Sequence, residues 1–175
     1  MSSTRCGGKN KAGKSCGNRT RADHLCWIHS QTKEGVRVKD SGISGAGKGL
    51  FAMEWKAPAS KVIFKKNEKI TDYKGETLTG RELRTRYPGS IDAKYVLRLA
   101  HNRFVDARNP TSCFGRFVNS NRHTGKRANC RLTKGNGTTK GSVKANRRIK
   151  QDEELLTSYG SGRRGLGYST QSDTE

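Results

Sequence analysis

Large apolar side chains are scarce in this chain, and their scarcity limits the kind of core that it can build. Leu, Ile, Val and Phe together supply 28 of the 175 residues, and 21 more are glycine. The 36 Lys and Arg residues outnumber the 15 Asp and Glu residues, which leaves a net charge of +21. Such a composition is close to that of disordered proteins. A folded state therefore needs a small core that is helped by another source of stability, such as a bound metal or ligand.

The charge and the cysteines indicate which partners the chain should bind and in which compartment it should reside. An excess of basic side chains favours polyanionic partners, above all nucleic acid, because neutralised phosphates release their counterions. No apolar run approaches the roughly 20 residues of a membrane span, and the start, MSSTRCGGKNKAGKS, has no apolar signal-peptide core. We therefore expect no membrane partner and no secretion. In that setting the five cysteines predict metal ligands or free thiols rather than disulfides.

Three of the cysteines and one histidine have the spacing of a zinc site. Cys6, Cys16, Cys26 and His29 form the pattern C-x9-C-x9-C-x2-H. Two residues between the last two ligands let the backbone turn around one ion, and four N/S ligands complete the tetrahedral shell of structural Zn²⁺. Metal binding would supply the folding free energy of this segment. His24 is an alternative fourth ligand with a less suitable spacing, and a disordered basic arm is the alternative to a metal site.

Residues 8–15, GKNKAGKS, also match the phosphate-binding pattern G-x4-G-K-[ST]. That loop requires a hydrophobic strand before it and a helix after it, and neither pattern flanks these residues. We therefore do not expect a nucleotide triphosphatase.

The composition divides the chain into four parts. We expect a Cys/His zinc knuckle at residues 1–30, a short polar linker at 31–35, one domain at 36–160 and a C-terminal tail at 161–175.

Within the main domain, short apolar runs alternate with Gly-rich turns, which predicts many short strands and no parallel βαβ units. Helical character is confined to TLTGRELRTRY (77–87) and SIDAKYVL (90–97). The strand-like runs are VRV, GLFA, SKVIF, YVLRL, RFVDA, FGRFV, NCRLT, GSVKA and ELLTSY.

Three segments of this domain belong together by their order and separation. Residues 41–52, SGISGAGKGLFA, are a glycine-rich turn that enters an apolar strand, and glycines let backbone groups approach a ligand closely. Residues 104–121 read FVDARNPTSCFGRFVNSN, and residues 142–160 read SVKANRRIKQDEELLTSYG. In this order the segments resemble the SET-domain protein lysine methyltransferases, and the length of the chain is similar to that of small viral and protist members. The matching residues are Gly45, Gly47, Gly49, Leu50, Phe51, Ala52, Val105, Asp106, Ala107, Arg116, Phe117, Val118, Asn119, Ala145, Arg147, Ile149, Glu153, Glu154, Leu155, Tyr159 and Gly160.

The resemblance implies a fold, a reaction and a set of site residues. The implied fold is mostly β, with several short sheets around a threaded (pseudoknot) C-terminal segment, preceded here by the zinc-binding knuckle. The implied reaction is transfer of a methyl group from S-adenosylmethionine to a lysine amine. Tyr159 matches the catalytic tyrosine, Tyr95 a channel aromatic, and Ser120 stands where the family has His. The implied cofactor-binding residues are Gly45, Ala46, Gly47, Lys48, Tyr95, Arg116, Phe117, Asn119, Ser120 and Tyr159.

The resemblance also bears on product and partners. Thr157 replaces the bulky aromatic that limits methylation in the family, so we expect room for di- or trimethylation. Histones are the family's commonest substrates. Because a chain at +21 should repel a free basic tail, we expect the substrate to be a histone within a nucleosome. We expect the protein to act in the nucleus, either as a nuclear protein or after delivery from a virion. The alternative is a non-catalytic module that binds nucleic acid or chromatin with a decayed site. The candidate DNA-facing residues are Arg122, His123, Lys126, Arg127, Arg131, Arg147, Arg148 and Lys150.

Overall fold

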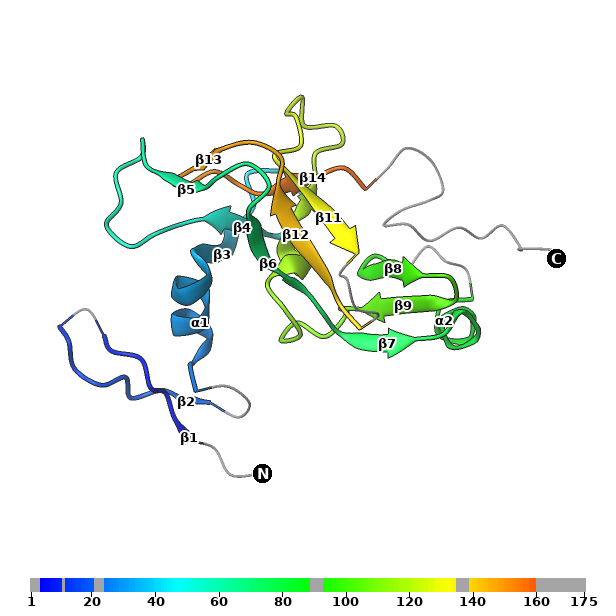
Figure 1. Cartoon of the computed structure of the whole chain (residues 1–175), viewed down its shortest axis with the longest axis horizontal. Coiled ribbons are helices and arrows are strands. Elements are labelled where there is room, and N and C mark those ends of the chain that lie inside the picture. Colours follow the sequence, from blue (N-terminus) through cyan, green and yellow to red (C-terminus); the bar gives the residue numbers. More distant parts are fainter. Residues whose placement is uncertain (1–3, 11, 21–23, 89–92, 135–138, 160–175) are drawn as a thin grey trace.

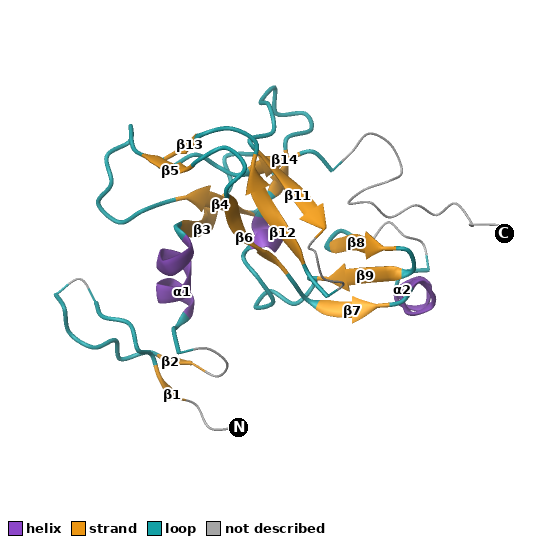
Figure 2. Ribbon diagram, viewed as in Figure 1, coloured by secondary structure: helices purple, strands orange, loops and turns teal. Residues whose placement is uncertain are grey.

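Short strands dominate the structure, as the sequence predicted. The computed structural model describes residues 4–10, 12–20, 24–88, 93–134 and 139–159. Within these residues the strands form sheets of two or three strands, and helices are few (Figures 1 and 2). The elements in chain order are β1 (Thr4–Arg5), β2 (Arg19–Thr20), α1 (Trp27–Glu34), β3 (Val36–Asp40), β4 (Lys48–Ala52), β5 (Val62–Phe64), β6 (Lys69–Tyr73), β7 (Glu76–Leu78), α2 (Gly80–Arg86), β8 (Val96–Ala100), β9 (Arg103–Asp106), the 3₁₀ helix η1 (Gly115–Phe117), β10 (Asn119–Ser120), β11 (Cys130–Lys134), β12 (Gly141–Ala145), β13 (Ile149–Lys150) and β14 (Leu156–Thr157).

Two three-stranded sheets form the body of the main domain. One has the order β11-β12-β6 and the other β7-β9-β8, and every pair in both is antiparallel. Helix α2 lies beside the second sheet (Figure 1). It begins with a capping box, in which the Thr79 hydroxyl accepts the Glu82 N–H and the Glu82 carboxylate accepts the Thr79 N–H. The helix predicted in residues 77–87 is thus confirmed, with its start set by Thr79.

The last described segment of the chain, residues 153–159, passes between distant parts of the domain and is called the closing segment below. On one side the Leu155 N–H donates to the Leu50 carbonyl at 2.7 Å and the Ala52 N–H to the Glu153 carbonyl at 2.9 Å. On the other side β14 pairs in parallel with β10, and the Asn129 side chain bonds the backbone at Glu154 and Leu156. This is the threaded arrangement that the resemblance implied. It brings Asn119 and residues 153–155 into contact with β4.

The scarce apolar residues are concentrated in small cores. The main cluster lies between β4, β6, β12 and the closing segment, and Leu50, Ile149 and Leu155 in it are fully buried. Two smaller clusters lie in and around the sheet β7-β9-β8. Interlocked short strands therefore share few large side chains, which is how a chain of this composition builds a core. None of the helices in the described ranges is long and apolar enough to span a bilayer.

Three local predictions differ from the structure. FGRFV (114–118) was expected as a strand but contains η1, because Phe114 and Phe117, three residues apart, share one side of a 3₁₀ turn. Residues 31–34, expected within a linker, form the second half of α1, and Gly35 ends that helix with a left-handed φ of 67°. In SIDAKYVL, residues 90–92 lie outside the described residues. The remainder leads into β8, where pairing with β9 overrides helical propensity.

Candidate active site and metal centre

The glycine-rich turn at residues 41–47 is closed on itself and open on its outer side. The Ser41 N–H donates to the Gly47 carbonyl at 2.8 Å, and the Ala46 N–H to the Ile43 carbonyl at 3.1 Å. Gly45 and Gly47 have φ values of 74° and 67°, which side chains other than glycine rarely adopt. No atom lies within 4 Å of the position that a Cβ would take at either glycine. The backbone of this turn is therefore accessible to a ligand.

Glu154 connects this turn to the closing segment. Its Oε1 accepts the Ser41 hydroxyl at 2.6 Å, and its Oε2 accepts the Gly42 N–H at 3.0 Å. The same carboxylate accepts the Asn119 side-chain amide at 3.2 Å. Three segments distant in the sequence thus meet at one carboxylate. Glu154 is among the residues that carry the resemblance, but the sequence did not identify these partners, and it missed Ser41.

Asn119 and Ser120 form β10, directly beside the closing segment. The Asn119 side-chain amide also donates to the Lys48 carbonyl at 3.1 Å, while the Lys48 ammonium pairs with Asp40 at 2.7 Å. Ser120 is in parallel register with Thr157, and its hydroxyl accepts the Arg122 N–H at 3.2 Å. The predicted residues of the glycine-rich turn and of the Asn119 segment are therefore brought together.

Tyr159 follows β14 and is held by the residue before Asn119. Its hydroxyl donates to the Val118 carbonyl at 2.6 Å. Burial raises the pKa of Tyr159 to about 12, and the nearby phenol of Tyr95 and thiol of Cys130 act in the same direction. The hydroxyl therefore stays protonated at physiological pH. With its proton directed at a carbonyl, its oxygen lone pairs are left to accept a hydrogen bond.

Tyr95 is more exposed than Tyr159 and is stacked against Arg116. The Arg116 guanidinium lies 4.2 Å from the centre of the Tyr95 ring and 4.9 Å from that of Phe117. The same guanidinium donates to the carbonyls of Ala107 at 2.8 Å and Arg108 at 3.2 Å. Arg116 was predicted as a cofactor-binding residue, and its observed contacts are with these protein groups.

Thr157 lies inside the closing segment and is 1% exposed. Its carbonyl accepts the Asn121 N–H at 2.9 Å, which fixes β14 against the turn that follows β10. The backbone environment of Thr157 is therefore rigid.

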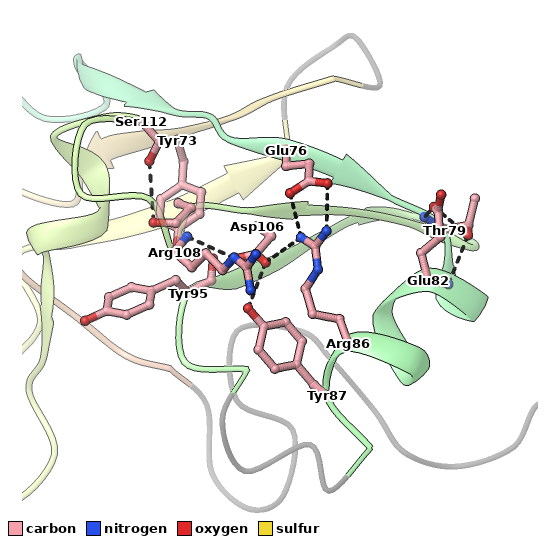
Figure 3. A network of polar contacts seen from close by, with 11 residues as sticks. Tyr73, Glu76, Thr79, Glu82, Arg86, Tyr87, Tyr95, Asp106, Arg108 and Ser112 are labelled. Carbon is pink, nitrogen blue, oxygen red and sulfur yellow. Dashed lines mark hydrogen bonds and ion pairs between the residues drawn. The ribbon is translucent and has the colours of Figure 1, made fainter.

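A second polar cluster lies on the sheet β7-β9-β8. The Arg86 guanidinium bonds Glu76 at 2.6 Å and Asp106 at 3.1 Å, and the Tyr87 hydroxyl donates to Asp106 at 2.8 Å (Figure 3). Figure 3 also shows the Tyr95 ring pointing away from this network. A hollow of about 460 Å³ adjoins it, and none of the residues predicted to bind cofactor lines that hollow. The network joins α2 to the sheet, with the buried Asp106 carboxylate as the shared acceptor of Arg86 and Tyr87.

Comparison with known families identifies the family of this chain. The family model of the SET domain matches residues 47–160. The chain belongs to the SET-domain family. Enzymes of this family are generally protein lysine methyltransferases and use S-adenosylmethionine. A comparison with curated proteins found no match.

The SET match includes Gly47, Asn119 and Tyr159, which the contacts above connect through Glu154, Val118 and the closing segment. The family motifs therefore coincide with one place in the fold. Gly160, the last matched residue, lies outside the described residues.

The four predicted metal ligands lie together N-terminal to the SET domain. Cys6, Cys16, Cys26 and His29 place their donor atoms within 4.8 Å of one another. The His29 Nδ1 is 3.4 Å from the Cys6 sulfur and 3.3 Å from the Cys26 sulfur. Zinc bonds of about 2.3 Å to sulfur and about 2.0 Å to nitrogen fit donors at such separations. His29, rather than His24, is the histidine of this cluster.

The surroundings of the cluster suit a bound cation. The His29 Nε2 is 2.7 Å from the Lys9 carbonyl, and a metal-ligating histidine typically donates its second ring N–H to such a group. The Cys6 sulfur accepts the N–H of Gly8 at 3.4 Å and of Cys26 at 3.1 Å. Burial raises the pKa of the Cys26 thiol, but hydrogen bonds around the sulfur outweigh it and bring that pKa down to about 6. The thiolate, the form that binds zinc, is therefore favoured at Cys26. At Cys16 a backbone hydrogen bond at Asn18 is outweighed by burial and by the neighbouring thiols, which raise the pKa of that cysteine.

The same cluster accounts for the phosphate-loop pattern. Lys9 and Ser15 form an antiparallel bridge between the cysteines, and α1 begins only at Trp27. Among the residues that the structure describes around it, the pattern thus has neither the preceding apolar strand nor the following helix that phosphate binding requires.

Proposed function

We propose that this chain is an S-adenosylmethionine-dependent protein-lysine N-methyltransferase. The observation that supports the proposal most is the SET-family match over residues 47–160, because its motif residues converge at Glu154 and the closing segment. The catalytic residue of the proposal is Tyr159, with Tyr95 beside it.

The residues around the glycine-rich turn fit a bound cofactor of this kind. The open side of Gly45 and Gly47 leaves room for a ligand. When bound, S-adenosylmethionine supplies a methyl group carried on a positively charged sulfur. Further cofactor contacts in the proposal come from Ala46, Lys48, Tyr95, Arg116, Phe117, Asn119, Ser120 and Tyr159.

The protein's part in the chemistry is to hold a neutral lysine amine in line with the methyl group. A free lysine has a pKa of about 10.4, and only its neutral form attacks. A desolvated channel and a nearby positive charge both favour that neutral form. The Tyr159 hydroxyl, which donates to Val118, can accept an N–H of the amine and so orient its lone pair.

We further propose that the product reaches di- or trimethyl-lysine. Thr157 stands where the family carries Phe or Tyr, and a smaller side chain leaves more room for a methylated amine. The matched substitution, Thr157→Phe, restores the family's residue.

The proposed substrate is a histone lysine in a nucleosome, encountered in the nucleus. Electrostatics support this choice, because a chain at +21 repels a free basic peptide and is attracted to DNA. Arg122, His123, Lys126 and Arg127 are exposed on a turn that Asn121 and Thr124 hold in shape. Of the other candidate DNA contacts, Arg131 is bonded to Asn67 and Asn146, and Arg147 is paired with Glu153.

Transfer of labelled methyl from S-adenosylmethionine to nucleosomes, free histones and a protein extract tests the proposal. Label on a protein lysine supports it, and the best acceptor identifies the substrate class. Absence of both transfer and cofactor binding by calorimetry would favour a non-catalytic nucleic-acid-binding module, the function that Ser120 in place of the family's His would suit.

A further inference from the structure

Helix α1 joins the metal cluster to the SET domain, and its first residue is fixed by a metal ligand. Cys26 is the residue before the helix, with extended backbone, and its carbonyl accepts the Ser30 N–H at 2.9 Å. Trp27 is therefore joined by one peptide bond to Cys26, a predicted metal ligand. Because Trp27 follows Cys26 directly, its side chain should shift when the cluster no longer holds Cys26. Its other tie within α1 is the Gln31 side-chain amide, which donates to the Trp27 carbonyl at 3.3 Å.

The other half of α1 has an anchor that does not involve the cluster. The Gln31 side chain is buried and accepts the Val38 N–H at 2.6 Å, and the Met53 N–H donates to the Gly35 carbonyl at 2.9 Å. An isolated helix of eight residues is marginal in water. Loss of the metal should therefore release the first turn of α1 while the second half stays on β3 and β4.

Trp27 packs its ring against the 3₁₀ helix that precedes the active-site residues. Its ring centre lies 4.6 Å from that of Phe114 and 6.2 Å from that of Phe117, both in edge-to-face arrangement. Such geometries are the favourable ones for aromatic pairs. Ile28, the next residue of α1, is 48% exposed.

The residues in and beside η1 contact each part of the proposed active site. The Val118 carbonyl holds the Tyr159 hydroxyl at 2.6 Å, and Arg116 stacks on Tyr95 at 4.2 Å. Asn119 follows directly and bonds Glu154 and Lys48. A displacement of η1 would therefore shift Tyr95, Tyr159 and the side-chain amide of Asn119 together.

We propose that Trp27 is a positioning residue that couples metal binding in the Cys/His cluster to the geometry of η1 and, through it, of the active site. The link to catalysis rests on the proposed function, whereas the coupling between cluster and η1 does not.

The test uses the full zinc-loaded chain and measures amide hydrogen exchange over residues 114–121 together with calorimetric affinity for S-adenosylmethionine. Removing zinc with a chelator should speed exchange in this segment about tenfold or more in the unmodified chain, as local opening does. Trp27→Ala should show the faster exchange with zinc still bound, and should weaken cofactor affinity about five- to tenfold. Chelation should then add little to either effect.

Two further variants separate packing from general damage. Trp27→Phe keeps an aromatic edge on Phe114 and should restore slow exchange and affinity, and Ile28→Ala should match the unmodified chain in both. Equal exchange in Trp27→Ala and Ile28→Ala would overturn the coupling, as would an equal effect of chelation on Trp27→Ala and the unmodified chain. If exchange follows the prediction but no variant binds the cofactor, the coupling stands and the proposed function fails.

Discussion

Glu153 and Glu154 are neighbours in the sequence and hold different parts of the molecule. Glu154 bonds Ser41, Gly42 and Asn119 around the glycine-rich turn. Glu153 pairs with Arg147 at 2.6 Å and accepts the Lys150 N–H at 2.7 Å, within its own turn. The pair therefore offers a matched test of which carboxylate shapes the glycine-rich turn, where the cofactor is proposed to bind.

Glu154→Gln should weaken S-adenosylmethionine binding about tenfold, because a side-chain NH₂ replaces one of the two oxygens that accept from Ser41, Gly42 and Asn119. Glu153→Gln should leave that affinity unchanged and cost about 1 kcal/mol of stability. Calorimetry and chemical unfolding check the two effects, and equal affinities in both variants would contradict the assignment.

The stability effect of Glu153 should depend on pH. Burial alone raises the pKa of Glu153, but the Arg147 guanidinium and the Lys150 N–H outweigh it and lower that pKa. A lowered pKa stabilises the fold above the unfolded value of about 4.3 and loses its effect as pH falls through the folded value. The difference in unfolding free energy between Glu153→Gln and the unmodified chain should therefore be full at pH 7 and disappear in acid.

The side chain at position 157 should determine how many methyl groups the product lysine receives. Mass spectrometry of the methylated acceptor should find di- or trimethyl-lysine with the unmodified chain, and Thr157→Phe should shift the product toward monomethyl-lysine. Monomethyl-lysine alone from the unmodified chain would show that Thr157 does not enlarge the site.

Among the elements, the N-terminal segment should depend most on a bound metal. Its apolar cluster consists of the three cysteines and Leu25, and its strands β1 and β2 have two residues each. A segment so small would take its folding free energy from the ion. Figure 1 shows it set apart from the sheets, with α1 between.

Elemental analysis should find one zinc per chain, and Cys26→Ser should lose it whereas His24→Ala should retain it. The physical reason is that His29, not His24, directs its Nδ1 at the sulfurs of Cys6 and Cys26. Zinc lost in His24→Ala and kept in His29→Ala would reverse the ligand assignment.

The elements also show what a sequence can predict. The β4, β9 and β12 strands and the zinc ligands followed from local patterns, since period-2 runs and short ligand spacings are local properties. β10 and β14 have two residues each and exist because each pairs with the other. Similarly, η1 depends on the packing of Phe114 and Phe117 against Trp27, so the apolar residues of its segment were misleading as a strand signal. The side-chain contacts of Glu154 join segments 35 or more residues apart, and Arg116 meets Tyr95 by ring stacking. No single-sequence pattern records such contacts.

At the scale of the whole molecule, charge should decide the acceptor. Nucleosomes should be methylated about tenfold or more faster than free histone tails at low salt, and the advantage should shrink between about 50 and 200 mM salt as phosphate contacts weaken. Replacing Arg122, Lys126 and Arg127 together with Glu should remove the advantage and spare activity on the free tail. Free tails that outperform nucleosomes at every salt concentration would contradict the proposed chromatin substrate.

The threaded closing segment connects the parts of the proposed active site. It places the Tyr159 hydroxyl against the Val118 carbonyl and the Glu154 carboxylate against the glycine-rich turn. In the proposed function this arrangement transfers methyl groups, and Tyr159 is its catalytic residue.

The most direct measurement compares the unmodified chain with Tyr159→Phe for methyl transfer and for S-adenosylmethionine affinity in the same preparations. Transfer should fall about 100-fold or more, in the range of lost acid–base and orienting groups. Cofactor affinity should change less than about twofold, because Phe keeps the aromatic ring of the proposed cofactor contact and removes only the hydroxyl. Transfer unaffected by the substitution, or no transfer by the unmodified chain to any acceptor, would show that Tyr159 is not the catalytic residue of a methyltransferase.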